Sequence, residues 1–172
     1  MPPDPALVPV HILRHGKAER QSATGRDEDR LLTHRGVLQA AHVGRVLAGE
    51  YPESPGVIAS SPLARALATA AVVRLELRWP ITVEESLATD RSLHEMTEAA
   101  LRLIARAADS RAALVLVGHN PQLSALLARL CGGDEHAFTL RTGHLAALRA
   151  PARSPLGRSE LFASHRLEGD DE

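Results

Sequence analysis

Short apolar runs alternate along this chain with longer segments in which apolar residues recur at helical spacing. A short run rich in Val, Ile and Leu predicts a buried strand, and the longer pattern predicts a helix that packs through one face. Alternation of the two is typical of α/β proteins, in which helices cover both faces of a mostly parallel sheet. The chain is therefore expected to form a three-layer α/β/α sandwich with a mostly parallel central sheet and a C-terminal β-hairpin.

The boundaries of the expected elements follow from these runs and from the cap and turn residues between them. Strands are predicted at residues 8–13, 57–59, 81–83 and 113–117, and the strands of the hairpin at residues 144–149 and 160–166. Helices are predicted at residues 33–49, 61–77, 92–108 and 120–130. The second and fourth helices are expected to start with a cap residue followed by proline, at Ser61-Pro62 and Asn120-Pro121.

The bulk properties restrict the class of protein. A length of 172 residues suits one domain spanning residues 1–172, with residues 1–6 and 168–172 expected to be flexible. Aromatic residues make up 2% of the chain and the formal net charge is −1, which argues against nucleic-acid binding. No apolar run is long enough to cross a bilayer, and no secretory signal is apparent. We expect a cytoplasmic monomer that does not bind membranes.

The sequence predicts neither a disulfide nor a metal centre nor a cofactor. Cys131 is the single cysteine and follows a leucine-rich helical pattern, so it is expected to be a small buried residue at a helix end. The nine histidines are scattered, without the spacing that places two ligands on one helix face.

Polar groups follow three of the predicted strands. Arg14-His15-Gly16 follows the first strand, Ser60-Ser61-Pro62 follows the second and precedes Arg65, and Gly118-His119-Asn120-Pro121 follows the fourth. Ligands of open α/β sheets bind at the carboxyl ends of the strands, so parallel strands would bring His15, Arg65 and His119 into one pocket. Arginine matches phosphate oxygens with a planar fork of donors, and neutral imidazole is a nucleophile. Glycine at position 16 allows close backbone approach. The pattern predicts a phosphate site.

The motifs that carry this pattern resemble a known family. They are L-R-H-G-K-A (13–18), L-T-H-R-G (32–36), S-S-P-L-A-R-A-L-A-T-A (60–70), V-L-V-G-H-N-P (115–121) and R-T-G-H-L-A-A-L (141–148). The residues of these motifs and their order along the chain resemble those of the histidine phosphatase superfamily, which includes the phosphoglycerate mutases. The short length resembles the small bacterial phosphohistidine phosphatases of the SixA group.

The resemblance implies roles for individual residues. His15 would be the nucleophile that forms a phosphohistidine intermediate, Arg14 and Arg65 would hold phosphoryl oxygens, and a protonated His119 would add charge. Gly16, Lys17, Arg30 and Asn120 are the candidate substrate-binding residues; for Lys17 a solvated side chain, and for Asn120 a helix cap, are the alternatives. The SixA group usually has proline after the arginine at position 30, whereas this chain has Leu31.

The general acid has no clear candidate. Glu84, Glu85, Asp90, Glu95 and Glu98 lie in the region where many superfamily members carry a glutamate, but none stands in a matching motif. Phosphohistidine needs less acid assistance than an alkyl phosphate ester, because its nitrogen leaving group can already carry a proton. The resemblance therefore implies a metal-independent phosphatase acting on phosphohistidine in proteins. A phosphatase of small phosphorylated metabolites, such as esters or sugar phosphates, and a non-catalytic phosphate- or phosphoprotein-binding module are the alternatives.

Overall fold

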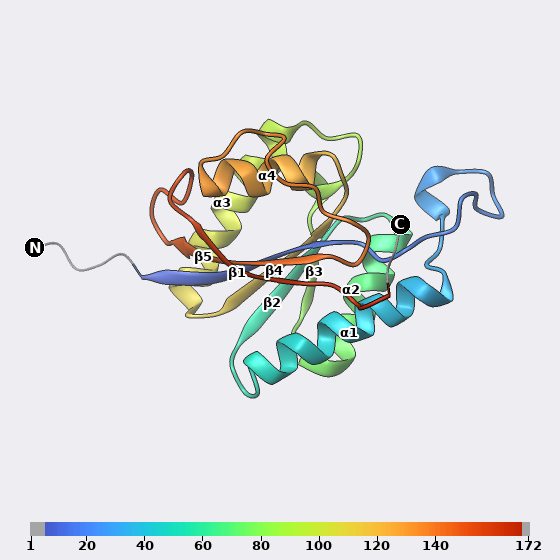
Figure 1. Cartoon of the computed structure of the whole chain (residues 1–172), viewed down its shortest axis with the longest axis horizontal. Coiled ribbons are helices and arrows are strands. Elements are labelled where there is room, and N and C mark those ends of the chain that lie inside the picture. Colours follow the sequence, from blue (N-terminus) through green and yellow to red (C-terminus); the bar gives the residue numbers. More distant parts are fainter. Residues whose placement is uncertain (1–5, 170–172) are drawn as a thin grey trace, which may run out of the picture.

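The computed structural model describes residues 6–169, and its central element is a six-stranded sheet in the order β3-β2-β4-β1-β5-β6 (Figure 1). The strands are β1 (Leu7–Arg14), β2 (Gly56–Ser60), β3 (Ile81–Val83), β4 (Ala113–Gly118), β5 (Leu145–Pro151) and β6 (Glu160–His165). The first four run parallel to one another, whereas β5 is antiparallel to β1 and β6 to β5. The predicted α/β sandwich with a mostly parallel sheet and a C-terminal hairpin is confirmed.

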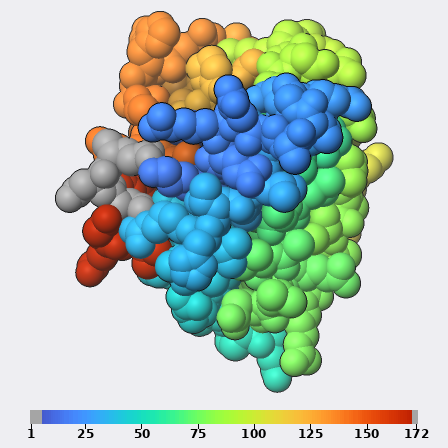
Figure 2. All heavy atoms as spheres, turned by 90° about the vertical axis from the view of Figure 1, so that its right-hand side faces the viewer, coloured from blue at the N-terminus to red at the C-terminus, as the bar shows by residue number. Residues whose placement is uncertain are grey.

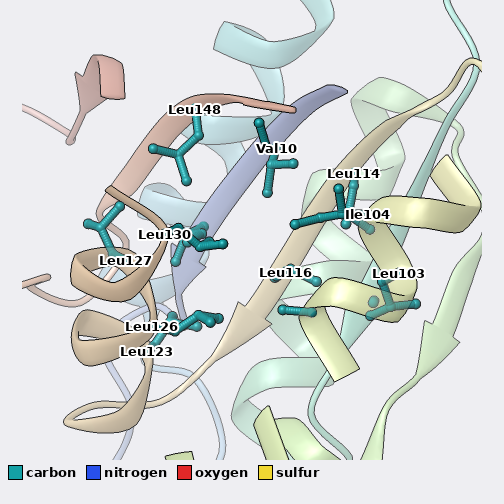
Figure 3. Close-up of a cluster of buried hydrophobic side chains, with 14 of the residues drawn as sticks. Val10, Leu103, Ile104, Leu114, Leu116, Leu123, Leu126, Leu127, Leu130 and Leu148 are labelled. Carbon is teal, nitrogen blue, oxygen red and sulfur yellow. The ribbon is translucent and has the colours of Figure 1, made fainter. Parts of the chain in front are cut away.

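Helices cover both faces of the sheet (Figure 1). They are α1 (His34–Glu50), α2 (Ala64–Leu77), α3 (Leu93–Ser110) and α4 (Gln122–Cys131). The central strand β4 is buried on both sides, and its side chains alternate between two apolar clusters. Leu114 and Leu116 pack with α3 and α4 (Figure 3), whereas Val115 and Val117 pack with α1 and α2. Burial on both faces explains why this strand is an uninterrupted apolar run.

Two of the four predicted helix starts are wrong. Thr33 caps α1 as expected, and Ser92, where the third helix was expected to start, caps α3; each side chain accepts a hydrogen bond from the backbone three residues on. By contrast, α2 begins at Ala64 and α4 at Gln122, without a side-chain cap from Ser61 or Asn120. Both polar side chains contact residues distant in sequence instead, as described below.

Other expectations concern the chain ends, the cysteine and the membrane. Flexibility is expected for residues 1–6 and 168–172, and of these, residues 1–5 and 170–172 lie outside the described residues. Cys131 ends α4 but is only partly buried, so the expectation of a buried cysteine is wrong in degree. Across residues 6–169, no helix combines the length and the apolar character that a bilayer span requires.

Candidate active site

The carboxyl ends of three neighbouring strands meet at one face of the molecule. In the registers of β1, β2 and β4, Arg14 is level with Gly118, and Ser60 with Val117. Two backbone bonds extend this alignment beyond the strands, because His15 N donates to Gly118 O and Ser61 N donates to Val117 O. The segment that follows β1 spreads across this face (blue in Figure 2). Parallel strand ends therefore bring the predicted polar groups together.

His15 lies at the centre of this arrangement and is buried. Its Nδ1 donates a hydrogen bond of 2.7 Å to the carbonyl oxygen of Gly16, which can only accept, so Nδ1 carries the proton and Nε2 keeps its lone pair. Burial lowers the pKa of His15 from 6.5 to about 4, an effect that the Gly16 bond opposes and the charges of Arg65, Arg14 and Arg30 reinforce. The imidazole is therefore neutral at physiological pH, the form a nucleophile requires.

His119 lies beside His15, with 5.0 Å between the ring centroids. Its Nε2 is 2.7 Å from Ser61 Oγ, which also accepts from the backbone N of Leu63, so Ser61 holds the ring rather than capping α2. Burial and the neighbouring cations and His15 lower the pKa of His119 to about 3. The sequence predicts a protonated His119 when a dianion is bound. Without the dianion, the surrounding residues keep the His119 ring neutral.

Arg65 is brought to the site by the first turn of α2, and its side chain is almost fully buried. Its Nη1 donates to the carbonyl oxygen of Asp27 at 2.8 Å, and its Nη2 to Asp27 Oδ2 at 3.0 Å. Arg30 forms an ion pair with the same carboxylate, with Nε 2.9 Å from Asp27 Oδ1, and its Nη1 donates a hydrogen bond to Glu19 O. Asp27 therefore joins the two arginines. The sequence motifs do not include Asp27: its spacing of three residues from Arg30 is compatible with that pair, but nothing local indicates the contact with Arg65.

Burial raises the pKa of the Asp27 carboxyl, but hydrogen bonds and charge from Arg65 and Arg30 outweigh this and lower it below its usual range. Asp27 is therefore ionised at neutral pH. A carboxylate in this state cannot supply a proton to a leaving group.

Arg14 is oriented by a small network at the start of α4. Its Nη1 donates to the carbonyl oxygen of Leu140, which also accepts from Asn120 Nδ2 at 2.6 Å. Asn120 Oδ1 in turn accepts from Ser124 Oγ, and Ser124 Oγ accepts from the backbone N of Leu140. The side chain of Asn120 thus fixes the backbone that holds Arg14, and both ends of its amide contact protein rather than open space.

Gly16 permits a close approach, but to another part of the protein. A Cβ at this position would lie 2.5 Å from the carbonyl oxygen of Gly36 in α1. The backbone N of Gly16 donates to Thr69 Oγ1 on α2, and Thr69 Oγ1 donates to Arg65 O. The half-buried Lys17 follows, with its backbone N bonded to Gln39 of α1. These contacts fix Gly16, and with it the end of the His15 backbone, against both helices on this side of the sheet.

The candidate acids fall into two groups. Glu84 pairs with Arg102, Glu95 completes the capping box of α3, and Glu98 is exposed on α3. Glu85 and Asp90, by contrast, line a cavity of about 340 Å³ together with Asp27. Only these last two candidates are thus brought near the segment that contacts Arg65.

Groups suited to a metal ion are absent from the described part of the chain: among residues 6–169 there is no cluster of three or more His, Cys, Asp or Glu side chains arranged to hold one.

Comparisons with known proteins agree with the fold and the motifs. Residues 10–89 match the family model described as the histidine phosphatase superfamily (branch 1). The structure is similar to that of the protein histidine phosphatase SixA complexed with tungstate, with a TM-score of 0.78 and 24% identity over 92% of this chain and 97% of that one. No curated protein sequence matches the chain.

Two further solved structures widen the comparison. A putative phosphohistidine phosphatase SixA from Agrobacterium tumefaciens has a TM-score of 0.70 and 28% identity, over 92% of this chain and 97% of that one. A putative alpha-ribazole-5'-P phosphatase from Escherichia coli has a TM-score of 0.65 and 21% identity, over 91% and 96%.

Fold, family model and structural neighbours point to the same class of protein. The resemblance to the histidine phosphatase superfamily is confirmed by the match of residues 10–89, and the fold is similar to that of SixA phosphatases.

Proposed function

We propose that this protein is a metal-independent phosphatase that removes the phosphoryl group from phosphohistidine in proteins through an intermediate on His15. The observation that carries the proposal is the state of His15, neutral and with its proton fixed on Nδ1 by Gly16 O. In the first step Nε2 attacks phosphorus while the bond from phosphorus to the substrate nitrogen breaks. In the second step water attacks the phosphorus atom held by Nε2, and the bond between phosphorus and Nε2 breaks. The protons of the water leave with the inorganic phosphate, and the neutral imidazole is restored.

The charge of the site supports a phosphoryl dianion as the bound group. Three guanidinium groups, of Arg14, Arg30 and Arg65, contribute three positive charges, and the Asp27 carboxylate removes one. With both histidines neutral, these four side chains carry a net positive charge, which suits a dianion. Phosphoryl transfer depends mainly on such positioning and neutralisation, so no metal is required by this arrangement.

The leaving group that fits best is one that needs no acid. Asp27 is ionised, Glu84 and Glu95 are engaged elsewhere in the fold, and Asp90 pairs with Arg91, so Glu85 is the candidate acid left near the site. A phosphohistidine whose other ring nitrogen is protonated departs as neutral imidazole, whereas an alkyl ester must be protonated as it leaves. This difference favours phosphohistidine as the substrate.

The cavity beside Asp27 supports the same choice. It is lined by the carboxylates of Asp27, Glu28, Glu85 and Asp90 and by the guanidinium of Arg91. Glu28 and Asp90 pair with Arg26 and Arg91, so Glu85 adds the negative charge that this wall presents. A carboxylate next to a phosphate site disfavours leaving groups that carry carboxylates or further phosphates, and it tolerates neutral or cationic ones. We therefore propose a phosphorylated protein as the partner. We also propose that the protein acts as a monomer in the cytoplasm.

Small phosphate esters are the second candidate substrates, because the structure is also similar to an alpha-ribazole-5'-P phosphatase. A single assay series separates the candidates. Turnover of a phosphohistidine peptide and of a panel of sugar phosphates is measured in EDTA, with wild-type protein and with His15→Ala. We expect preference for the peptide, acid-labile phosphate on the wild-type protein, and no turnover by the variant.

The remaining outcomes each decide the matter. Full activity of His15→Ala would rule out the proposal, and preference for sugar phosphates would establish the second candidate. Phosphate binding without turnover would identify a binding module. Activity that disappears with EDTA would indicate a metalloenzyme.

A further inference from the structure

Asp27, which joins the two arginines, neither forms a bond to phosphorus nor transfers a proton in the proposed reaction. Asp27 contacts Arg65 through both its main-chain carbonyl and its carboxylate, and it contacts Arg30 through the other carboxylate oxygen. One ionised side chain thus sets the relative position of two cations that the proposed reaction requires. The role of Asp27 between these two arginines rests on the proposed function.

Asp27 occupies only one edge of the Arg65 guanidinium. A guanidinium offers a terminal edge formed by Nη1 and Nη2 and a side edge that includes Nε. Asp27 accepts from Nη1 and Nη2. The Nε atom is buried, and within residues 6–169 it makes no hydrogen bond. Because a buried donor without an acceptor costs stability, the side edge is the one suited to an anionic ligand. Asp27 and a phosphoryl group can therefore bind Arg65 together.

The segment that carries Asp27 is fixed at its base. Ala18 and Leu32 form an isolated antiparallel bridge, Glu19 N donates to Leu31 O, and Thr33 N donates to Lys17 O. The short helix η1 (Asp27–Asp29) then places the Asp27 carbonyl where it accepts from both Arg65 Nη1 and Arg30 N. The position of the carboxylate is thus set by backbone as well as by charge.

We propose that Asp27 is a positioning residue that aligns Arg65 and Arg30 for the phosphoryl group and offsets part of their charge. It acts through the two guanidinium groups and does not touch the reacting atoms. The opposite role, an internal anion that competes with substrate, would require the carboxylate to bind the edge that the substrate uses, whereas Asp27 hydrogen-bonds only Nη1 and Nη2 of Arg65.

The experiment compares Asp27→Asn with Asp29→Asn, the same substitution in the same short helix. Asp29 contacts Thr24 and Arg26 on the exposed side and neither arginine of the site. For Asp27→Asn we expect kcat to fall about 10- to 100-fold, because misplacing a clamp costs rate without removing it. Inorganic phosphate, titrated by calorimetry, is expected to bind roughly 3- to 10-fold more tightly, because one negative charge has been removed. Asp29→Asn should match the wild type in both measurements.

Asp27→Glu separates charge from position. It keeps the carboxylate but moves it by one methylene, so phosphate affinity should stay within about 3-fold of wild type while kcat remains reduced. Unchanged or increased kcat in Asp27→Asn would overturn the proposal, and so would a parallel loss of kcat and phosphate affinity, which would indicate a purely structural role. If the wild type shows no turnover, the proposed function fails, and the phosphate titrations alone then decide the role of Asp27: affinity in Asp27→Asn equal to or below that of wild type overturns it.

Discussion

The imidazole rings of His15 and His119 lie 5.0 Å apart between centroids, at an interplanar angle of 51°. The two residues are 104 positions apart in the chain (119 less 15) and follow neighbouring parallel strands, β1 and β4. Each ring has one nitrogen fixed, by Gly16 O and by Ser61 Oγ respectively. The second nitrogens therefore remain for a ligand, and the fixed contacts become testable parts of the site.

The contact between Ser61 and His119 gives the first prediction. Ser61→Ala removes the hydroxyl that orients the ring, so kcat should fall about 10-fold, whereas His119→Ala removes the donor itself and should cost on the order of 100- to 1,000-fold. Steady-state kinetics on a phosphohistidine peptide measures both. Ser110→Ala, at the exposed end of α3, is the control. Equal losses in Ser61→Ala and His119→Ala would mean that Ser61 does more than orient the ring.

The low pKa of His15 predicts the acid limb of the activity profile. Because the imidazole stays neutral down to about pH 4, kcat/KM should lose no activity to protonation of His15 between pH 8 and pH 5, and should fall as pH drops through 4. Correcting each rate for the ionisation of the substrate phosphate isolates the enzyme group. An enzyme pKa near 6.5 in that profile would show that His15 is not held neutral as described.

Stability should depend on pH through His11, which is fully buried on β1 and bonded to Tyr51. Burial lowers its pKa from 6.5 to about 4, so the unfolded chain binds this proton at a higher pH than the folded protein does. The contribution to stability is complete above about pH 6.5 and is lost as pH falls towards 4, by up to about 3 kcal/mol. Urea unfolding from pH 7.5 to 4.5 measures it. His11→Leu should reduce the slope, and the exposed control His94→Leu should not.

The strands and the four long helices were predictable because each carries a local signal. The run that forms β4 is apolar throughout, since it is buried on both faces, and the caps at Thr33 and Ser92 involve only neighbouring residues. The same local logic failed at Ser61 and Asn120. Their side chains bind His119 and Leu140, and those contacts depend on how distant segments meet. Asp27 was missed for the same reason, because an acidic residue in a polar segment has no local pattern that indicates a buried arginine partner.

Asn120 tests whether a residue predicted to bind substrate acts through Arg14 instead. Asn120→Ala removes a donor from Leu140 O and an acceptor from Ser124, which loosens the carbonyl that holds Arg14. We expect kcat/KM to fall about 10-fold. Ser124→Ala breaks the same network and should reproduce part of that loss. If Asn120→Ala alone has an effect, the side chain contributes by contacting substrate, as the sequence suggested.

Gly16 and Gly36 lie so close that neither position tolerates a side chain. A Cβ on Gly16 would stand 2.5 Å from Gly36 O, and a Cβ on Gly36 would stand 2.2 Å from Lys17 O, in both cases against backbone that cannot rotate away. Gly16→Ala should therefore destabilise the protein by about 1–3 kcal/mol. It should also reduce turnover sharply, because the carbonyl of Gly16 sets the tautomer of His15. Chemical unfolding and peptide turnover measure the two effects.

The matched control for this pair is Gly49→Ala near the end of α1, where an added Cβ meets nothing within 4 Å. Alanine is the better helix former by up to about 1 kcal/mol, so this variant should be as stable as wild type or more so, with unchanged turnover. If Gly16→Ala behaved like Gly49→Ala, the contact between Gly16 and Gly36 would be loose enough to accommodate a methyl group. The fixed proton on His15 Nδ1, which the proposed nucleophile requires, would then lack its structural basis.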